Sequence, residues 1–421
     1  MSAAGGGGAT GASGKRRVVV TGIGLASPIG HDLPTAVAAL RDGRHGIVAM
    51  PEWADVQGLA TRLAGLAKDV PFGDWPRKKV RSMGRVALLA TYATEQALKD
   101  AGLEQDLHSI PDIGLAYGST HGSSTAQEEF CRTLFARNGL RGIPSTSYLK
   151  FMSNTCVVNL AHFFGIRGRV IATCAACTSG SNAIGYGFEA IRDGELDIML
   201  CGGAEEMHFT HAAVFDILYA TSRHYNDRPG AGSRPFDVDR DGLVVAEGAC
   251  TFVLEEAERA RRRGARIHGE VIGFGTSCDG QHVTQPSPEG MAAAMRNALA
   301  DARVAPEDVD YINAHATSTD IGDLAESQAT LQVFGDRVPI SSTKGHTGHT
   351  LGACGALESA FCLAMMNDGF LAPNRNLDKP DPRCAPLRYV RETSEARDLR
   401  ITMNNNFAFG GINTSLVFRR A

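Results

Sequence analysis

Short apolar runs alternate with longer amphipathic stretches along most of the chain. The apolar runs predict buried strands, at 17–21, 113–117, 169–173 and 197–201. The first and last of these runs lead into glycines, where we expect turns. The amphipathic stretches predict helices, at 33–41, 85–101 and 178–192. This alternation is typical of an α/β protein with parallel strands, whose strand ends carry the functional groups.

The order of predicted elements restarts near residue 264. The second set of strands is expected at 271–274, 311–314, 339–341, 400–403 and 414–418. The helices between them are expected at 291–302, 324–333 and 349–367. We therefore predict two similar α/β halves, 15–263 and 264–421. They follow a Gly/Ala/Ser-rich segment, 1–14, that reads as a flexible tail and not as a signal peptide.

Composition indicates a soluble enzyme. Hydrophobic residues make up 43% and charged residues 21% of the 421 residues, and the net charge of -4 gives no general attraction to nucleic acid or to anionic membranes. No stretch reaches the roughly 18 apolar residues of a membrane span. The ten cysteines are scattered and do not form a disulfide pattern, so we expect reduced thiols and a cytoplasmic location.

Cys177 lies between a predicted strand and a helix made of small residues, in the segment TCAACTSGSNAIGYG. A helix N-terminus stabilises a thiolate, and its free N–H groups can bind an oxyanion. Cys177 is therefore a candidate nucleophile. A buried structural cysteine is one alternative, and the Cys174–Cys177 spacing also matches a thiol–disulfide motif. A redox role would leave two histidine segments unexplained.

Those two segments are NAHATSTDIGD around His315 and SSTKGHTGHTLGACGALE, which contains Lys344, His349 and Glu358. Two imidazoles beside a nucleophile could hold a thioester carbonyl and polarise a departing carboxylate. Lys344 is the nearest candidate partner for Glu358, whose apolar surroundings predict burial. Solvent-exposed side chains are the alternative. We expect no metal site, because the calcium-like start at 237–242 has Gly248 where the twelfth position needs a glutamate.

These segments resemble a β-ketoacyl-[acyl-carrier-protein] synthase of the elongating type, closest to synthases I and II. The resemblance runs from about 17 to 419 and extends to further segments, at 18–30, 201–206, 233–249 and 405–418. It implies the thiolase fold, with two similar βαβαβαββ halves in a five-layer α-β-α-β-α arrangement. It also implies a homodimer, although pairing with a chain-length subunit stays open.

The resemblance implies a role for each matching residue. Cys177 would carry the acyl group, His315 and His349 would assist malonyl decarboxylation, and Lys344 and Glu358 would form a supporting pair. The other roles implied are acidic support from Asp323 and Glu326, a pantetheine tunnel of Thr284, Thr317 and Thr319, a gate at Phe409 whose N–H joins that of Cys177 in the oxyanion hole, and docking of the acyl carrier protein on Arg77, Lys78, Lys79, Arg81 and Arg85.

The implied reaction is a ping-pong decarboxylative Claisen condensation that gives β-ketoacyl-carrier protein and carbon dioxide. It implies no cofactor of its own, because the partner carries the phosphopantetheine. Two other classes stay open: a non-catalytic chain-length partner, which would lack the nucleophile, and a coenzyme A thiolase, which would need a second cysteine near the turn at 405–415.

The sequence departs from the family at several positions, and His121 is the most informative. It stands where housekeeping synthases have an apolar residue at the acyl-pocket gate. An unpaired buried polar group costs about 1–3 kcal/mol, so a plain alkyl chain should be disfavoured there. Fatty acid elongation is the main expectation, and a polyene, aryl-polyene or polyketide-type substrate is the alternative.

Overall fold

The computed structural model describes residues 15–104, 107, 110 and 112–421. The flexible tail expected at 1–14 lies outside these residues. The centre of the molecule is one eleven-stranded sheet with the order β13-β11-β10-β15-β16-β9-β1-β8-β6-β4-β5. Its strands are β1 (Val18–Ala26), β4 (Gly114–Gly118), β5 (Val170–Thr173), β6 (Ile198–Glu205), β8 (Gly248–Glu256), β9 (Gly269–Cys278), β10 (Tyr311–Asn313), β11 (Pro339–Ser341), β13 (Arg388–Tyr389), β15 (Ile401–Ala408) and β16 (Ile412–Arg419).

Two small sheets complete the β-structure. They are formed by β2 (Ile47–Ala49), β3 (Leu63–Gly65) and β7 (Val245–Ala246), and by β12 (Phe370–Leu371) and β14 (Glu395–Ala396). The α-helices are α1 (Leu33–Arg41), α2 (Arg77–Val80), α3 (Arg85–Asp100), α4 (Ser124–Arg137), α5 (Ser147–Phe151), α6 (Thr155–Phe164), α7 (Ser179–Arg192), α8 (Phe209–Asp216), α9 (Ala257–Arg262), α10 (Pro288–Ala302), α11 (Asp320–Phe334), α12 (Lys344–Thr347) and α13 (Cys354–Asp368).

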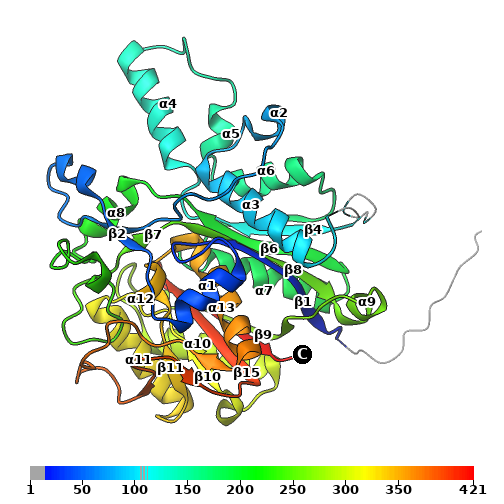
Figure 1. Cartoon of the computed structure of the whole chain (residues 1–421), viewed down its shortest axis with the longest axis vertical. Coiled ribbons are helices and arrows are strands. Elements are labelled where there is room, and N and C mark those ends of the chain that lie inside the picture. Colours follow the sequence, from blue (N-terminus) through cyan, green and yellow to red (C-terminus); the bar gives the residue numbers. More distant parts are fainter. Residues whose placement is uncertain (1–14, 105–106, 108–109, 111) are drawn as a thin grey trace, which may run out of the picture.

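The sheet divides at the pairing of β1 with β9 (Figure 1). Strands from the first half of the chain lie on one side of this pair, and strands from the second half lie on the other. Helices α7 and α13 contact each other and both sections of the sheet, whereas α3 packs against the first section and α10 against the second. This is the expected five-layer α-β-α-β-α order. The expected boundary between 263 and 264 falls between α9 and β9 and stays a prediction.

The prediction of a parallel sheet is wrong for its central part. Strands β4, β5 and β6 are parallel to one another, and so are β10, β11 and β15. Strands β1, β8, β9 and β16 instead pair antiparallel with their neighbours. For β15 and β16 the physical reason is connection length, because they are joined by a tight turn that can only return the chain antiparallel. The other antiparallel pairs join strands that are distant in the sequence, so no local connection sets their direction.

The turns expected at two glycine-containing segments are also wrong. Strand β1 continues through Gly22 and Gly24, and β6 continues through Gly202 and Gly203. A Cβ atom at Gly24 would lie 2.1 Å from the carbonyl oxygen of Ala93 in α3. One at Gly203 would lie 2.4 Å from the oxygen of Gly352. These glycines therefore permit close packing of helices on the sheet and do not end the strands.

The helix expected at 349–367 begins later than predicted. Leu351–Ala353 forms one 3-10 turn, Leu351 has a φ of 48°, and α13 starts at Cys354. Because a left-handed residue interrupts the helix, His349 lies on a loop before it. Every residue of α13 from Cys354 to Met366 is buried. No helix among the described residues is long and apolar enough to cross a membrane.

Candidate active site

Cys177 lies in the tight turn that joins β5 to α7. Ala176 has a φ of 47°, and the Ser179 hydroxyl donates to the Ala176 carbonyl while it accepts the Ala175 N–H. This turn holds the thiol two residues before the first residue of α7, at 7% exposure. Backbone strain of this kind persists only where the surrounding structure fixes it. The prediction of a cysteine at a helix start is confirmed.

The Cys177 sulfur meets the imidazole of His349, whose Nε2 is 3.0 Å from Sγ. The His315 ring lies against the His349 ring, with centroids 5.1 Å apart and planes at 86°. Reactive atoms of all three side chains lie within 4.8 Å of one another. Three elements distant in sequence supply them, because His315 follows β10 and His349 precedes α13. The structure thus brings the expected trio together.

Burial controls protonation at this site. It raises the pKa of the Cys177 thiol to about 12, an effect that the Lys344 charge opposes. Burial also lowers the pKa of His315 and His349 well below the usual value, and Lys344 lowers both further. The resting site therefore holds a thiol and two neutral imidazoles. Desolvation thus outweighs the stabilisation of a thiolate that a helix N-terminus provides.

Lys344 and Glu358 form a buried ion pair behind the histidines, with side-chain exposures of 1% and 3%. Burial disfavours the Lys344 ammonium, but Glu358 more than offsets this and the pKa of Lys344 is raised. Asn406 Nδ2 donates to Glu358 Oε2 at 2.7 Å, and the Cys354 thiol donates to the Cys177 carbonyl at 3.2 Å. The sequence analysis missed Asn406 and Cys354. A run of three buried asparagines on β15 was the available signal for the first.

Glu326 and Asp323 fix the loop that carries His315. Glu326 accepts the backbone N–H groups of His315 and Ala316 at 2.8 and 2.6 Å, and burial raises its pKa to about 8. Asp323 accepts the N–H of Phe236 and faces the fully buried Arg240 guanidinium at 3.8 Å. Both acidic residues therefore support the site, as expected.

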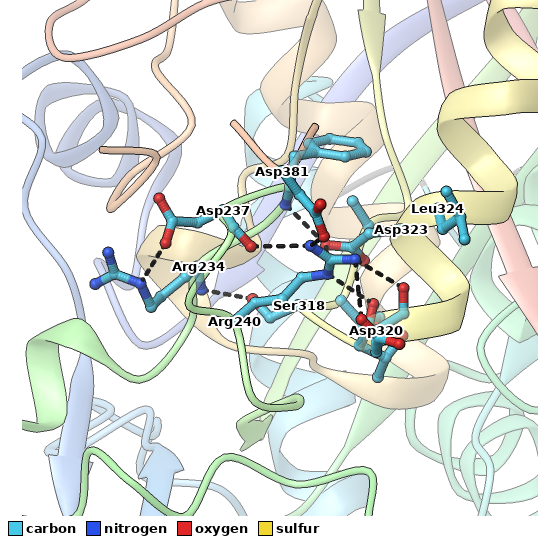
Figure 2. Close-up of polar contacts among 12 residues, drawn as sticks. Arg234, Asp237, Arg240, Ser318, Asp320, Asp323, Leu324 and Asp381 are labelled. Atoms are coloured by element: carbon cyan, nitrogen blue, oxygen red, sulfur yellow. Dashed lines mark hydrogen bonds and ion pairs between the residues drawn. The ribbon is translucent and has the colours of Figure 1, made fainter. Parts of the chain in front are cut away.

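Arg240 is a third residue that the sequence analysis missed. Figure 2 shows its guanidinium surrounded by carboxylates, with Asp381 at 2.6 Å and Asp320 at 3.4 Å. It also donates to the carbonyl oxygens of Thr319 and Asp320 at 3.2 and 2.8 Å. Arg240 thereby holds the start of α11 and, with it, the end of the His315 loop.

A cavity of about 380 Å³ leads to the trio. Thr284, Thr317 and Thr319 line it, as expected for the tunnel residues. Phe409 lies in the turn between β15 and β16, lines the same cavity, and packs its ring 5.5 Å from that of Phe215. Phe409 is 39% exposed, so it lies between the cavity and the outside of the molecule.

The structure places the expected docking residues in two groups. Arg77, Lys78, Lys79 and Arg81 are exposed on or beside α2. Arg85 differs from them, because its guanidinium binds both oxygens of Glu247 at 2.7 Å and the Ala67 carbonyl at 2.9 Å. Its side chain is 38% exposed, and its docking role stays a prediction.

His121 is not among the residues that line this cavity. It lies on the loop after β4, and its ring stacks on that of His211 with centroids 4.2 Å apart and planes at 19°. Its role as an acyl-pocket gate stays a prediction.

Comparisons with known proteins agree with this geometry. The family model "Beta-ketoacyl synthase, N-terminal domain" matches residues 15–260, and "Beta-ketoacyl synthase, C-terminal domain" matches 268–378. The chain is 38% identical to 3-oxoacyl-[acyl-carrier-protein] synthase 1 of Haemophilus influenzae, over 96% of this chain and 99% of that protein. The expected resemblance is confirmed.

Two solved structures are similar over nearly the whole chain. A β-ketoacyl synthase from Burkholderia phymatum STM815 has a TM-score of 0.93 and 50% identity, covering 96% of this chain and all (100%) of that chain. The ishigamide ketosynthase/chain length factor has a TM-score of 0.88 and 34% identity, with 97% and 100% covered. The thiolase-like fold is therefore confirmed. The chain belongs to the β-ketoacyl synthase family of condensing acyltransferases.

Proposed function

We propose that the protein joins an acyl group on Cys177 to malonyl-acyl-carrier protein by decarboxylative Claisen condensation, in fatty acid elongation. The observation that carries the proposal is the contact of the Cys177 thiol with His349, beside His315, in a cavity that Phe409 also lines. The reaction needs no metal or cofactor of its own, because the partner supplies the phosphopantetheine thioester.

In the first half-reaction the Cys177 sulfur attacks the carbonyl carbon of the acyl thioester. Its proton passes to the departing pantetheine sulfur, and a new thioester forms on Cys177. His349, with its proton on Nε2, donates to the attacking sulfur, while the nearby Lys344 charge lowers the cost of the developing thiolate. The backbone N–H groups of Cys177 and Phe409 would bind the carbonyl oxygen as it becomes an oxyanion.

In the second half-reaction the malonyl thioester loses carbon dioxide. The electron pair of the broken C–C bond moves into the thioester and forms an enolate, whose oxygen accepts hydrogen bonds from His315 and His349. The enolate carbon then attacks the Cys177 thioester, and the released thiolate regains a proton. Neutral imidazoles suit this step, because they donate to the enolate without an acidic proton that would quench it, and burial keeps both neutral.

Mass spectrometry separates the two half-reactions. Wild-type protein incubated with an acyl-carrier protein should gain one acyl group on Cys177 and lose it when malonyl-carrier protein is added. Cys177→Ala should gain no acyl group, whereas His315→Ala should be acylated and then release little product. The proposal fails if Cys177→Ala still gives β-ketoacyl product. A wild-type protein that is never acylated would instead support a non-catalytic chain-length partner.

The proposal includes an acidic carrier protein that docks on Arg77, Lys78, Lys79 and Arg81. All four side chains are exposed. The relative from Haemophilus influenzae is named for a carrier-protein substrate, which supports this choice. Opposite charges across such a surface mainly raise the association rate, so the interaction should weaken with salt. A cytoplasmic location belongs to the same proposal, because the reaction needs the Cys177 thiol reduced.

We also propose a homodimer formed along β5. This strand is an outer edge of the eleven-stranded sheet, and Val170 on it is 44% exposed. Helices α4 and α5 project from the body on the same half of the molecule (Figure 1), and they and their connecting segment expose Phe135 and Leu140 at 75% and 73%. An apolar edge of this kind is stabilised by pairing with another chain. A chain-length subunit is the alternative partner, as in the ishigamide ketosynthase complex.

One observation favours a second candidate function, condensation in a specialised polyene, aryl-polyene or polyketide-type pathway. His121 and His211 stack two polar rings between the loop after β4 and α8, and a saturated chain that reached them would gain less than from apolar side chains. A panel of saturated and conjugated acyl-carrier proteins tests this candidate. Equal or faster turnover of long saturated chains would exclude it.

A further inference from the structure

Helix α8 connects the entrance of the cavity to a group of histidines. Phe215 lines the cavity that contains Cys177 and packs against Phe409. His211 precedes Phe215 by four residues in α8, so both side chains project from the same face of the helix, about 6 Å apart along its axis. A chain that enters past Phe409 and continues beyond Phe215 would therefore approach the His211 ring.

His121 forms the other half of this wall. Its loop is fixed close to the nucleophile, because Glu205 accepts the N–H groups of Thr120 and His121 and also that of Gly352. The thiol of Cys174, three residues before Cys177, points to the Thr120 carbonyl at 3.8 Å. The stacked rings of His121 and His211 thus lie between α8 and the loop beside the catalytic turn.

The polar atoms of this stacked pair are incompletely paired. His211 is fully buried, and its Nε2 meets the Ser124 hydroxyl at 2.7 Å. Within the described residues, Nδ1 of His211 and Nδ1 of His121 are both buried without a hydrogen-bond partner. The neighbouring His208 is different, since its two ring nitrogens meet Thr210 and Glu128 at 2.8 Å each. Buried polar atoms left unpaired need an explanation, and a ligand group that completes them is a physical one.

We infer that His121 and His211 are specificity-determining residues, and that the acyl substrate carries a hydroxyl or keto oxygen in its distal half that hydrogen-bonds to this pair. The inference rests on the proposed condensation at Cys177. Burial keeps both rings neutral, with the pKa of His211 lowered to about 3, so each ring can donate or accept. An unsubstituted alkyl chain at the same place would leave both Nδ1 atoms unpaired. The imidazole pair therefore discriminates between oxygenated and unsubstituted acyl chains by hydrogen bonding, in addition to any effect of ring shape.

The test is a comparison of matched substrates with the full-length protein. Medium-chain acyl-carrier proteins of one length would be offered with and without a single distal hydroxyl or keto oxygen, and kcat/KM would be measured with malonyl-carrier protein. We expect the better of the two oxygenated chains to exceed the unsubstituted chain by about tenfold. His121→Phe and His211→Phe keep a flat ring but remove the nitrogens, so each should bring this ratio close to one while the unsubstituted chain is turned over at least as fast.

The control is His162→Phe, at an exposed position on α6, which should leave the ratio unchanged. A loss of turnover for all substrates in one histidine variant would indicate misfolding, and the other variant would then decide. The inference is overturned if wild-type protein uses both chain types equally, or if both histidine variants keep the wild-type ratio. Failure of the proposed function looks different, because no chain would then acylate Cys177.

Discussion

The buried Lys344–Glu358 pair gives the sharpest prediction about stability. Its side chains are 1% and 3% exposed, so neither charge can be solvated if its partner is removed. Removing one member of such a pair costs about 3–5 kcal/mol. We expect Glu358→Leu to reach the upper end, because it leaves the ammonium unpaired and also deprives Asn406 of an acceptor. Lys344→Met should cost less, since burial already raises the pKa of Glu358 and the isolated carboxyl can take up a proton.

The double variant tests whether the loss of stability comes from the broken ion pair and not from altered packing alone. Lys344→Met combined with Glu358→Leu leaves no unpaired charge, so it should be less destabilised than the two single variants added together. Thermal unfolding followed by circular dichroism measures this, at about 2 °C or less per kcal/mol for a chain of this size. The single variants should therefore lose at most about 6–10 °C. Additive losses in the double variant would refute the reasoning, because they would mean that the two charges do not interact.

Three further predictions follow from the same structure. Lys344→Met should raise the pKa of His315 and His349, because the Lys344 charge lowers both. The acid limb of the plot of condensation rate against pH should then move to higher pH. An acid limb that stays in place would contradict this. Arg85→Ala should lower the melting temperature and leave the KM for carrier protein unchanged. Lys78→Ala should raise that KM several-fold at low salt and not at high salt. The opposite pattern would reassign the docking surface. Gly203→Ala should reduce the yield of folded protein, because its Cβ would lie 2.4 Å from a backbone oxygen. The control Gly139→Ala, whose Cβ would have its nearest atom at 3.6 Å, should give a normal yield. Equal yields would contradict the packing argument.

Most helix and strand positions could be read from hydrophobic periodicity. The expected helix at 33–41 matches α1 residue for residue, and those at 85–101 and 178–192 match α3 and α7 within one residue at each end. The two turn errors have one cause. Glycines within β1 and β6 were interpreted as turns, but Gly24 and Gly203 admit the backbone oxygens of Ala93 and Gly352, which are distant in the sequence. Local pattern carries no information about such approaches.

The strand directions failed for a similar reason. Alternation of strands and helices predicted parallel pairing, which holds at the outer strands of the sheet. The central strands follow short or indirect connections, and their pairing depends on which distant strand is available.

The sequence by itself determined the chemistry of this protein. Cys177, His315, His349, Lys344 and Glu358 were singled out as candidates by the segments that carry them, and the resemblance of those segments to β-ketoacyl synthases implied their roles. Their side-chain types restrict the reaction to a small set before any contact is known.

Only the tertiary structure decided protonation, partners and access. It showed that burial raises the pKa of the Cys177 thiol, that Arg85 pairs with Glu247, and that Asn406 completes the ion pair. It also placed His211 beside His121, a contact between residues 90 positions apart. The physical reason is that desolvation and pairing depend on which distant segments pack together, whereas residue type depends on the sequence alone.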